Sequence, residues 1–375
     1  MIINTKLFKE AADTILTATS IDKTITNLEL AAGNGAVFLN VTNLEYYVSI
    51  KQQIETQDTF RAVVDANTFL NLISTLNTDT LDISLVDNKV VIKANKTKYS
   101  IPLVFKNDKL EDVPMIRIAE PEVEMPISVD ILHGILNVNA KEVARVKKLD
   151  VDEIQRLYFI DETGCFTFNS GACINSFTLS KPVKMLLNDR IVKLFKLFNS
   201  DVNFMLGKEQ SIGGRTITKI ALMSNNVYVG AIIPTDDILL ERMQRPYENS
   251  KKFLTLDYPY KITIATDDLS AAINRLTQFT KNSIEKANML WILTNISVSG
   301  NEVTIKDSFG STEVFNTVDD TATTETYEFP VNLPDLKVIV DSCKNDKLTI
   351  LFGNYKNIVV TRDNISNVIP ERRTN

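Results

Sequence analysis

Apolar positions along this chain follow two spacings in turn, and the succession repeats six times. A short segment with apolar residues at i, i+3 and i+4 predicts a helix buried on one face. The segments after it alternate apolar and polar residues, as half-buried strands do. The pattern restarts about every 60–78 residues, with helices predicted to begin at Thr5, Ala66, Ser128, Asn188, Thr266 and Leu333. Such a recurrence favours a pseudo-symmetric body over a catalytic domain with one cleft.

The second, fourth and sixth units share one layout in detail. In each, an amphipathic helix is followed by an alternating segment that begins with aspartate, at residues 79–85, 201–206 and 346–351. Asn or Asp before the helices is typical of an N-cap, which accepts a hydrogen bond from a free N–H group of the first turn. The alternative is coincidence among ordinary α+β segments. The matching order in all three units argues against that alternative.

Two polar stretches divide the chain. Residues 120–126 and 244–252 contain proline and clustered charges without helix or strand periodicity, which is typical of linkers. They separate three parts of similar length, each with two units. We therefore predict an α+β protein of three similar domains, at residues 1–123, 124–250 and 251–375.

Composition narrows the class of protein. A hydrophobic content of 44% and a charged content of 23% are typical of globular proteins. No apolar run approaches the roughly 18 residues of a membrane span, and the N-terminus lacks a signal-peptide layout. The three cysteines, Cys165, Cys173 and Cys343, form no close metal-binding pair, and their odd number suits a reducing compartment. A cytoplasmic location is expected.

Groups for catalysis are scarce. His133 is the single histidine, so a multi-histidine metal site is excluded and nucleophile–base chemistry has little support. No glycine-rich phosphate-binding motif occurs, and residues 213–215 are better interpreted as a hairpin turn. The acidic pairs are Asp236-Asp237, Asp267-Asp268 and Asp319-Asp320. They leave a Mg²⁺-dependent nuclease as an alternative, although helix caps and solvated charge explain such pairs more simply.

The distribution of charge says more than its sum. A net charge of −6 predicts no general affinity for nucleic acid. Five of the six predicted helices nevertheless carry or precede basic residues, and the helix after Ala66 carries none. These residues are Lys6, Lys9, Lys23, Lys147, Lys148, Arg190, Lys193, Lys196, Lys281, Lys286, Lys337 and Lys344. Arg190, Lys193 and Lys196 lie opposite the apolar side of their helix. Together these positions suggest a phosphate-facing surface without sequence specificity.

Four segments resemble one family. The motif Val63-Val64-Asp65-Ala66-Asn67-Thr68-Phe69-Leu70 is similar to the opening of the second helix of the bacterial DNA polymerase III β subunit, the sliding clamp. Tyr99-Ser100-Ile101-Pro102-Leu103 with Glu111-Asp112-Val113-Pro114 resembles the end of its first domain. Phe168-Asn169-Ser170-Gly171-Ala172-Cys173-Ile174 lies where clamps have A-T-D-G-H-R-L. Asn367-Val368-Ile369-Pro370-Glu371-Arg372 resembles the ending V-V-M-P-M-R. The order and spacing extend the resemblance over essentially the whole chain.

The resemblance implies a DNA clamp fold of three domains, assembled as a head-to-tail homodimeric ring around duplex DNA. Helices would line the hole and carry the basic residues named above, and sheets would form the outside. The ring would be a processivity factor, not an enzyme, without metal or cofactor. The dimer contact would involve Tyr99, Ile101, Leu276 and Phe279.

The family also implies a pocket for short peptide motifs of the replicative polymerase and the clamp loader. Its lining would be Asn169, Gly171, Cys173, Ile174, Leu239, Met243, Tyr355, Ile369 and Pro370. Ala172-Cys173 replaces the usual His-Arg, so the preferred motif is expected to differ, as in a divergent or phage-encoded clamp. A repeat-built interaction scaffold that never contacts DNA is a further alternative.

Overall fold

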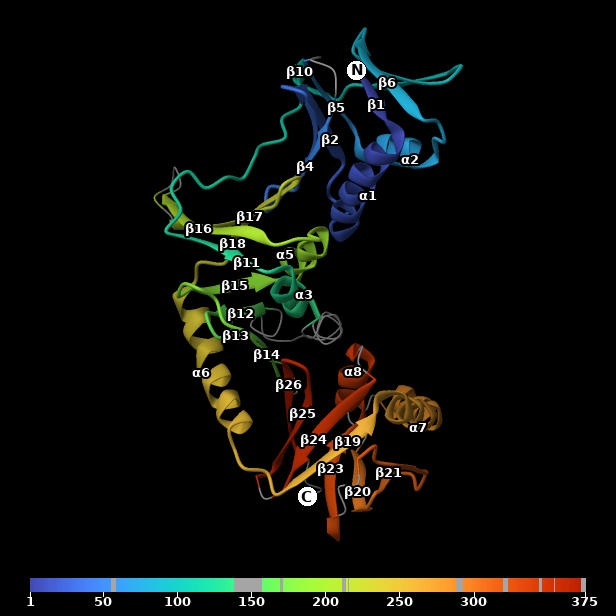
Figure 1. The fold of residues 1–375 in the computed structure, drawn as a ribbon, viewed down its shortest axis with the longest axis vertical. Helices are drawn as coiled ribbons and strands as arrows, with labels where there is room; N and C mark the ends of the chain where they lie inside the picture. The colour runs from blue at the N-terminus through green and yellow to red at the C-terminus, as the bar shows by residue number, and fades with distance from the viewer. Residues whose placement is uncertain are drawn as a thin grey trace. The chain divides into compact units, whose positions relative to one another are not determined.

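The computed structural model describes residues 1–375 except 55–58, 138–156, 169–170, 211–213, 215, 288–292, 320–322, 344–345, 354 and 372–375. Side chains of residues 279–287 and 323–325 are also outside the description. The chain divides into two compact units (Figure 1). Unit 1 contains Met1–His133 and Arg190–Thr235, and unit 2 contains Gly134–Asp189 and Asp236–Asn375.

All six predicted helices are present, within one residue of their predicted starts. They are α1 (Thr5–Ile21), α2 (Ala66–Thr75), α3 (Val129–Asn137), α5 (Asp189–Leu194, continued by the 3-10 turn η2, Phe195–Leu197), α7 (Thr266–Ala287) and α8 (Leu333–Ser342). The predicted caps are confirmed at two of them. Asn4 accepts a hydrogen bond from the Leu7 N–H, and Asp65 accepts one from the Thr68 N–H.

Unit 1 contains two sheets of four or more strands. The first small sheet has the order β1-β6-β7-β8, and the first large sheet has the order β11-β16-β17-β18-β4-β3-β2-β5. A two-stranded hairpin, β9 (Phe105–Lys106) with β10 (Lys109–Leu110), follows the first small sheet. The strands of the two sheets are β1 (Ile2–Asn4), β2 (Asn27–Gly33), β3 (Ala36–Thr42), β4 (Tyr46–Gln53), β5 (Phe60–Asp65), β6 (Thr80–Val86), β7 (Lys89–Ala94), β8 (Thr97–Pro102), β11 (Val123–Ile127), β16 (Val202–Gln210), β17 (Thr216–Met223) and β18 (Val227–Ile233).

Unit 2 has the same composition. Its second large sheet has the order β15-β12-β13-β14-β26-β25-β24-β19, and its second small sheet has the order β22-β21-β20-β23. The strands are β12 (Leu157–Asp161), β13 (Gly164–Phe168), β14 (Ala172–Ser176), β15 (Lys184–Asn188), β19 (Tyr260–Ala265), β20 (Leu293–Gly300), β21 (Glu302–Asp307), β22 (Thr312–Asn316), β23 (Thr323–Asn332), β24 (Lys347–Phe352), β25 (Asn357–Arg362) and β26 (Ile365–Pro370).

The order of elements repeats three times, over residues 2–102, 123–233 and 260–370. Each repeat has one strand, a helix, four strands, a second helix and three strands. The four middle strands form one half-sheet, and the first strand with the last three forms another. Each large sheet joins half-sheets of two different repeats, through β4 and β18 in unit 1 and through β14 and β26 in unit 2. Each unit therefore takes half-sheets from two repeats, and the middle repeat is shared between the two units.

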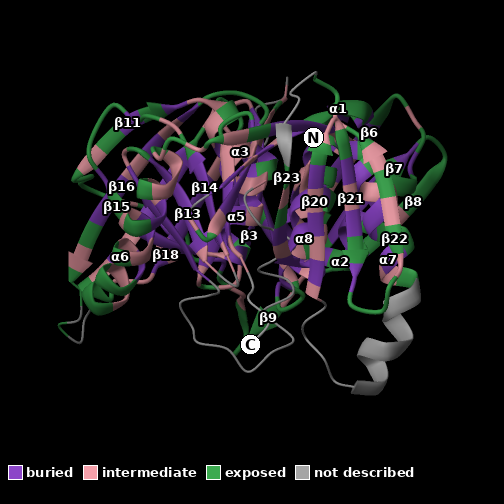
Figure 2. Cartoon of the chain, turned by 90° about the horizontal axis from the view of Figure 1, so that it is seen from below, coloured by how far each residue is buried: buried purple, intermediate pink, exposed green. Residues whose placement is uncertain are grey.

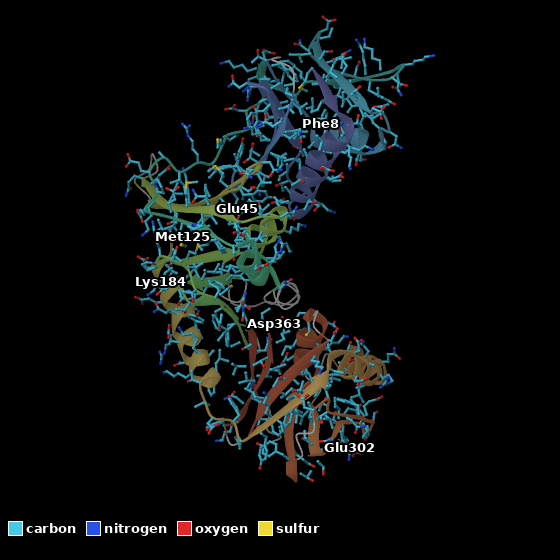
Figure 3. The ribbon with its side chains drawn as sticks, viewed as in Figure 1. Phe8, Glu45, Met125, Lys184, Glu302 and Asp363 are labelled. Carbon is cyan, nitrogen blue, oxygen red and sulfur yellow. The ribbon has the colours of Figure 1, made fainter. Side chains whose placement is uncertain are left out.

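Helices pack against these sheets, and many strand positions are buried, purple in Figure 2. In unit 1, Phe8 of α1 is fully buried (Figure 3) and meets the Phe69 ring of α2 edge-on, with centroids 6.2 Å apart. In unit 2, α7 and α8 cover a core that contains Phe329 and Phe352. The amphipathic pattern seen in the sequence therefore corresponds to helix-on-sheet packing.

The two predicted linkers need correction. Residues 244–252 belong to an additional helix, α6 (Asp237–Leu254), whose N-cap Asp236 accepts hydrogen bonds from the N–H groups of Ile238 and Leu239. Its interior proline, Pro246, and its polar outer side conceal the helical period, because proline usually ends a helix. The first linker is also shorter on its C-terminal side than predicted, since β11 begins at Val123.

Candidate nucleic-acid and partner interfaces

The expected basic residues that the structure describes lie on or next to helices. Lys6 and Lys9 are in α1, Lys23 follows it, and Lys193 and Lys196 are in α5 and η2. Lys281 and Lys286 lie inside α7 and do not follow it as expected, because the helix continues to Ala287. Their side chains, and all of Lys147, Lys148 and Lys344, are outside the described part of the chain.

Arg190 is not the freely solvated cation that its helix face predicted. Its guanidinium lies 3.1 Å from a carboxylate oxygen of Asp22 and 3.2 Å from one of Glu45. Glu45 is labelled in Figure 3 and immediately precedes β4, 145 residues away in sequence. Since Asp22 is buried, Arg190 has a structural role between α1, β4 and α5 that helical spacing does not show.

The environment of Asp22 determines its protonation. Burial by itself would raise the pKa of Asp22, but hydrogen bonds from the Thr24 N–H and from Asn43, with the charge of Arg190, outweigh it and hold the pKa below its usual 3.8. The ionised form therefore stabilises unit 1 above pH 3.8.

We expect the stability of unit 1 to fall as the pH drops below 3.8 through this lowered pKa, because the folded state must then protonate a paired carboxylate. Urea midpoints across this pH range would measure the effect. Asp22→Asn should reduce stability at pH 7 and flatten the pH dependence. An unchanged pH profile in this variant would contradict the assignment.

The remaining basic side chains vary in their surroundings. Lys337 of α8 hydrogen-bonds Asn274 of α7 and lies 3.4 Å from Asp341, and Lys9 donates to Asn77 at 3.1 Å. Partial burial and the neighbouring charge of Lys193 lower the pKa of Lys196. No ion pair of Lys6, Lys23 or Lys196 occurs within the described part of the chain. The exposed side of α2 carries Asn, Thr and Ser instead. The helix surfaces that the structure describes are therefore polar with scattered positive charge.

The residues expected to line a peptide pocket do not share one surface. Ile174 and Met243 belong to the buried cluster under α6, and Ile369 belongs to the separate cluster under α7 and α8. Cys173 points to the opposite side of β14 from Ile174, toward Cys165 and Tyr158, because neighbours in a strand face opposite ways. All four are buried. Gly171, Leu239, Tyr355 and Pro370 keep partial exposure, and Asn169 lies outside the described residues.

Helix α6 is the element that sequence reasoning missed at this site. It packs on the second large sheet across the junction of β14 and β26. Met243 and Tyr247, one turn apart, are fully buried against Phe159 and Phe166. The four-residue spacing of Met243, just before the polar stretch, and Tyr247, within it, was the available signal.

A buried polar group fixes the same helix. The Tyr247 hydroxyl lies 2.9 Å from the Thr163 hydroxyl and donates to Asp161 at 3.2 Å, and the Lys251 ammonium lies 4.6 Å from the Tyr247 ring centroid. Burial raises the pKa of Tyr247 far above its usual value, so the hydroxyl stays protonated as a donor. These contacts hold α6 to the β12–β13 turn.

The expected dimer residues lie at or behind sheet edges. Tyr99 and Ile101 are in β8, an edge of the first small sheet, and Tyr99 is half-buried. Ile101 and Leu276 are 4% and 1% exposed, so both side chains are buried within their own units. The side chain of Phe279 is outside the description. Residues that remain available for contact are therefore the outward-facing ones of the edge strand.

The second small sheet has a corresponding edge in β22, which the sequence pattern does not identify. The Asp307 N–H donates to the Ser311 carbonyl at 3.0 Å, and the Thr317 N–H donates to the Asn301 carbonyl at 2.8 Å. At the two ends of β22, Ser311 and Thr317 therefore belong to hydrogen-bonded pairs with β21, and such pairs occur at every second residue of an antiparallel ladder. The N–H of Val314 falls between them and points away from β21. The same alternation applies to β8. The Leu103 N–H donates to the Asn88 carbonyl, so the N–H of Ser100, three residues earlier, points away from β7.

An ion pair connects β22 to helix α7 behind it. Glu313 accepts two hydrogen bonds from Arg275 of α7, at 2.8 and 2.7 Å. This donation holds the pKa of Glu313 below its usual value. The edge strand is therefore fixed to the helix behind it, next to Leu276.

The histidine and the acidic residues considered for catalysis make contacts that are typical of structural residues. A ring nitrogen of His133 lies 3.0 Å from the Phe198 carbonyl oxygen, as expected for a satisfied histidine. Asp236 caps α6, and Asp267 and Asp268 lie in the first turn of α7, where negative charge is favourable. Among the described helices, none combines the length and apolar character that crossing a bilayer requires.

Comparison with known structures identifies the fold. Neither a protein-family model nor a curated protein sequence matches this chain at a significant level. The DNA polymerase III β chain of Streptococcus pneumoniae superposes with a TM-score of 0.75 at 15% identity, covering 100% of this chain and 99% of the other. The Bacillus subtilis sliding clamp gives 0.74 at 14%, with the same coverage. The Helicobacter pylori β clamp, bound to a DNA ligase peptide, gives 0.72 at 12%, again with that coverage. The chain therefore has the DNA clamp fold.

Proposed function

We propose that this protein is a DNA sliding clamp, a non-enzymatic ring that encircles duplex DNA in the cytoplasm and tethers a replicative polymerase. The observation that carries the proposal is the arrangement of half-sheets. Two junctions between repeats are closed within the chain, by β4 with β18 and by β14 with β26. The equivalent strands of the outer repeats, β8 and β22, remain unpaired edges. In this proposal the repeats are domains at residues 1–123, 124–250 and 251–375.

A second copy of the chain satisfies both edges. If β8 of one protomer pairs antiparallel with β22 of its partner, each small sheet becomes half of an eight-stranded sheet like the two already present. Unpaired edges are unfavourable because they expose free N–H and C=O groups. Two identical junctions close a head-to-tail dimer, which is a heterologous contact that closes on itself.

Each closed junction pairs the last strand of one repeat antiparallel with the third middle strand of another repeat. The same pairing of β8 with β22 would bring the outward N–H groups of Ser100 and Val314 against the strand of the other protomer. The half-buried rings of Tyr99 and Phe315 become covered.

A ring explains why the basic surface is modest. Enclosure holds DNA without tight contacts, so scattered lysines on polar helices suffice, and the contacts carry no sequence information. Lys6, Lys23 and Lys196 are the best candidates among the described residues. Arg190 is better assigned to the contact with Asp22.

Partner proteins are proposed to dock as short peptides beside α6. The Helicobacter pylori clamp with its ligase peptide supports this mode of recognition for the fold. The exposed part of the expected pocket here is Gly171, Leu239, Tyr355 and Pro370. The polymerase and the clamp loader are the expected partners.

Retention on closed DNA tests the proposal. After loading, the protein should stay on a nicked circle at high salt and leave the same DNA once it is linearised, because only a ring is trapped topologically. Gel filtration of labelled protein with DNA measures both. Equal loss from circle and line would indicate an open scaffold, and DNA cleavage with Mg²⁺ would indicate a nuclease.

A further inference from the structure

Unit 1 contains a pocket that belongs to none of the surfaces described above. Its volume is about 480 Å³. One side comes from the β3–β4 turn and the start of β2, and the other comes from the segment after β9. The residues used in the argument are Thr42, Asn43, Leu44, Lys106, Asp112 and Val113.

Leu44 occupies an unfavourable backbone conformation in this wall. Its φ is +71°, and its side chain is 67% exposed. The other described non-glycine residues with positive φ are Asn, Asp or Lys. Asn and Asp tolerate this region best, and a bulky apolar side chain does so poorly. An exposed leucine gains little from burial within the chain, so neither the fold nor solubility explains leucine here. An outlier of this kind points to a function for the side chain.

The turn that carries Leu44 is held rigidly. The Thr42 hydroxyl donates to the Tyr46 carbonyl at 2.8 Å and accepts from the Leu44 N–H at 3.1 Å. Asn43 accepts from the N–H groups of Glu45 and Tyr46, and its amide donates to Asp22 at 2.9 Å. Leu44 is therefore presented in one position, which reduces the ordering cost of binding a partner.

The opposite wall adds apolar surface. Val113 and Pro114 line the pocket, and Pro114 is exposed. Apolar side chains in the wall of a pocket are typical of a binding site.

The charge at the rim is unbalanced. Arg61 is shared between Glu29 and Asp112, and Lys106 lies 4.0 Å from Glu111. Among the residues that line the pocket, Glu111 and Asp112 are acidic and Lys106 is basic. Asp112 is the more exposed of the two carboxylates, at 86% of its side chain. The rim therefore complements a basic side chain.

We propose that this pocket docks a short extended peptide of a partner protein. An aliphatic or aromatic anchor of the peptide packs against Leu44, Val113 and Pro114, and an adjacent Lys or Arg of the peptide pairs with Asp112. The site is separate from α6 and from both sheet edges, and it does not depend on the clamp proposal.

A peptide selection with the full-length protein tests this inference. Random 12-residue peptides displayed on phage are selected on the wild type and counter-selected on Leu44→Asn. Enriched peptides should share an apolar residue next to Lys or Arg. In fluorescence polarisation they should bind Leu44→Asn at least 10-fold more weakly, and Asp112→Asn several-fold more weakly, than the wild type. Leu85→Asn, which changes an exposed leucine of β6, should bind as the wild type does.

Leu44→Asn separates binding from folding, because asparagine suits the left-handed conformation and should leave the thermal midpoint unchanged or raised. The variant should also keep its retention on circular DNA, so this test and the clamp test fail independently. Absence of an enriched motif, or equal binding by Leu44→Asn, would overturn the proposal. A change of sedimenting mass in that variant would also overturn it, by assigning the pocket to a second copy of the chain.

Discussion

Val314→Pro is expected to convert the proposed head-to-tail dimer into folded monomers. The N–H of Val314 points to the open edge of β22 and takes no part in the ladder with β21, so proline removes a donor of the seam and spares the unit itself. A buried partner left without its hydrogen bond costs roughly 1–3 kcal/mol. A ring contains the change twice, so we expect a weakening on the order of 10²-fold or more.

Sedimentation velocity across protein concentration measures this effect. Ser100→Pro should act in the same way from the β8 side, and Val314→Thr and Ser100→Ala retain the N–H and should remain dimeric. Both proline variants should also lose retention on circular DNA. A proline variant that sediments as the wild-type dimer would show that β22 is not the seam.

Met243→Ala is expected to lower the free energy of unfolding of unit 2 by about 2–5 kcal/mol, the range for truncating a buried methionine. Met243 is fully buried between α6 and the second large sheet, so the truncation leaves a cavity under the helix. Urea denaturation followed by circular dichroism measures the loss. Ile238→Ala, on the same helix at 70% exposure, is the control and should change stability by less than about 0.5 kcal/mol.

The burial of Met243 changes how a charged substitution there is interpreted. Met243→Asp would place an unpaired carboxylate in the core, and loss of polymerase stimulation would then follow from the detachment of α6. Leu239→Ala and Tyr355→Ala alter half-exposed members of the proposed pocket and are the better tests of docking. A Met243→Ala protein as stable as the wild type would mean that α6 does not depend on this contact.

Local periodicity in the sequence determines much of this fold. The starts of α1, α2, α7 and α8 coincide with the predicted residues, because an apolar stripe at helical spacing is a property of neighbouring residues. At α1 and α2 the caps Asn4 and Asp65 are equally local signals. The sixfold recurrence likewise predicted the pairing of each helix with a half-sheet. The sequence pattern did not predict helix α6. Its apolar stripe has only a few residues, and Pro246 and the polar outer side interrupt the helical period.

Tertiary structure alone decided the roles of individual side chains. Arg190 has the spacing of a solvated cation, but its partners Asp22 and Glu45 come from distant segments, and no local pattern encodes that meeting. Cys173 and Ile174 are adjacent in sequence and face opposite sides of one strand. The unpaired edges of β8 and β22 follow from the order of strands in the sheets, a long-range property. The sequence by itself thus determined the repeated unit through short-range spacing, and chain topology decided which faces and edges remain available for partners.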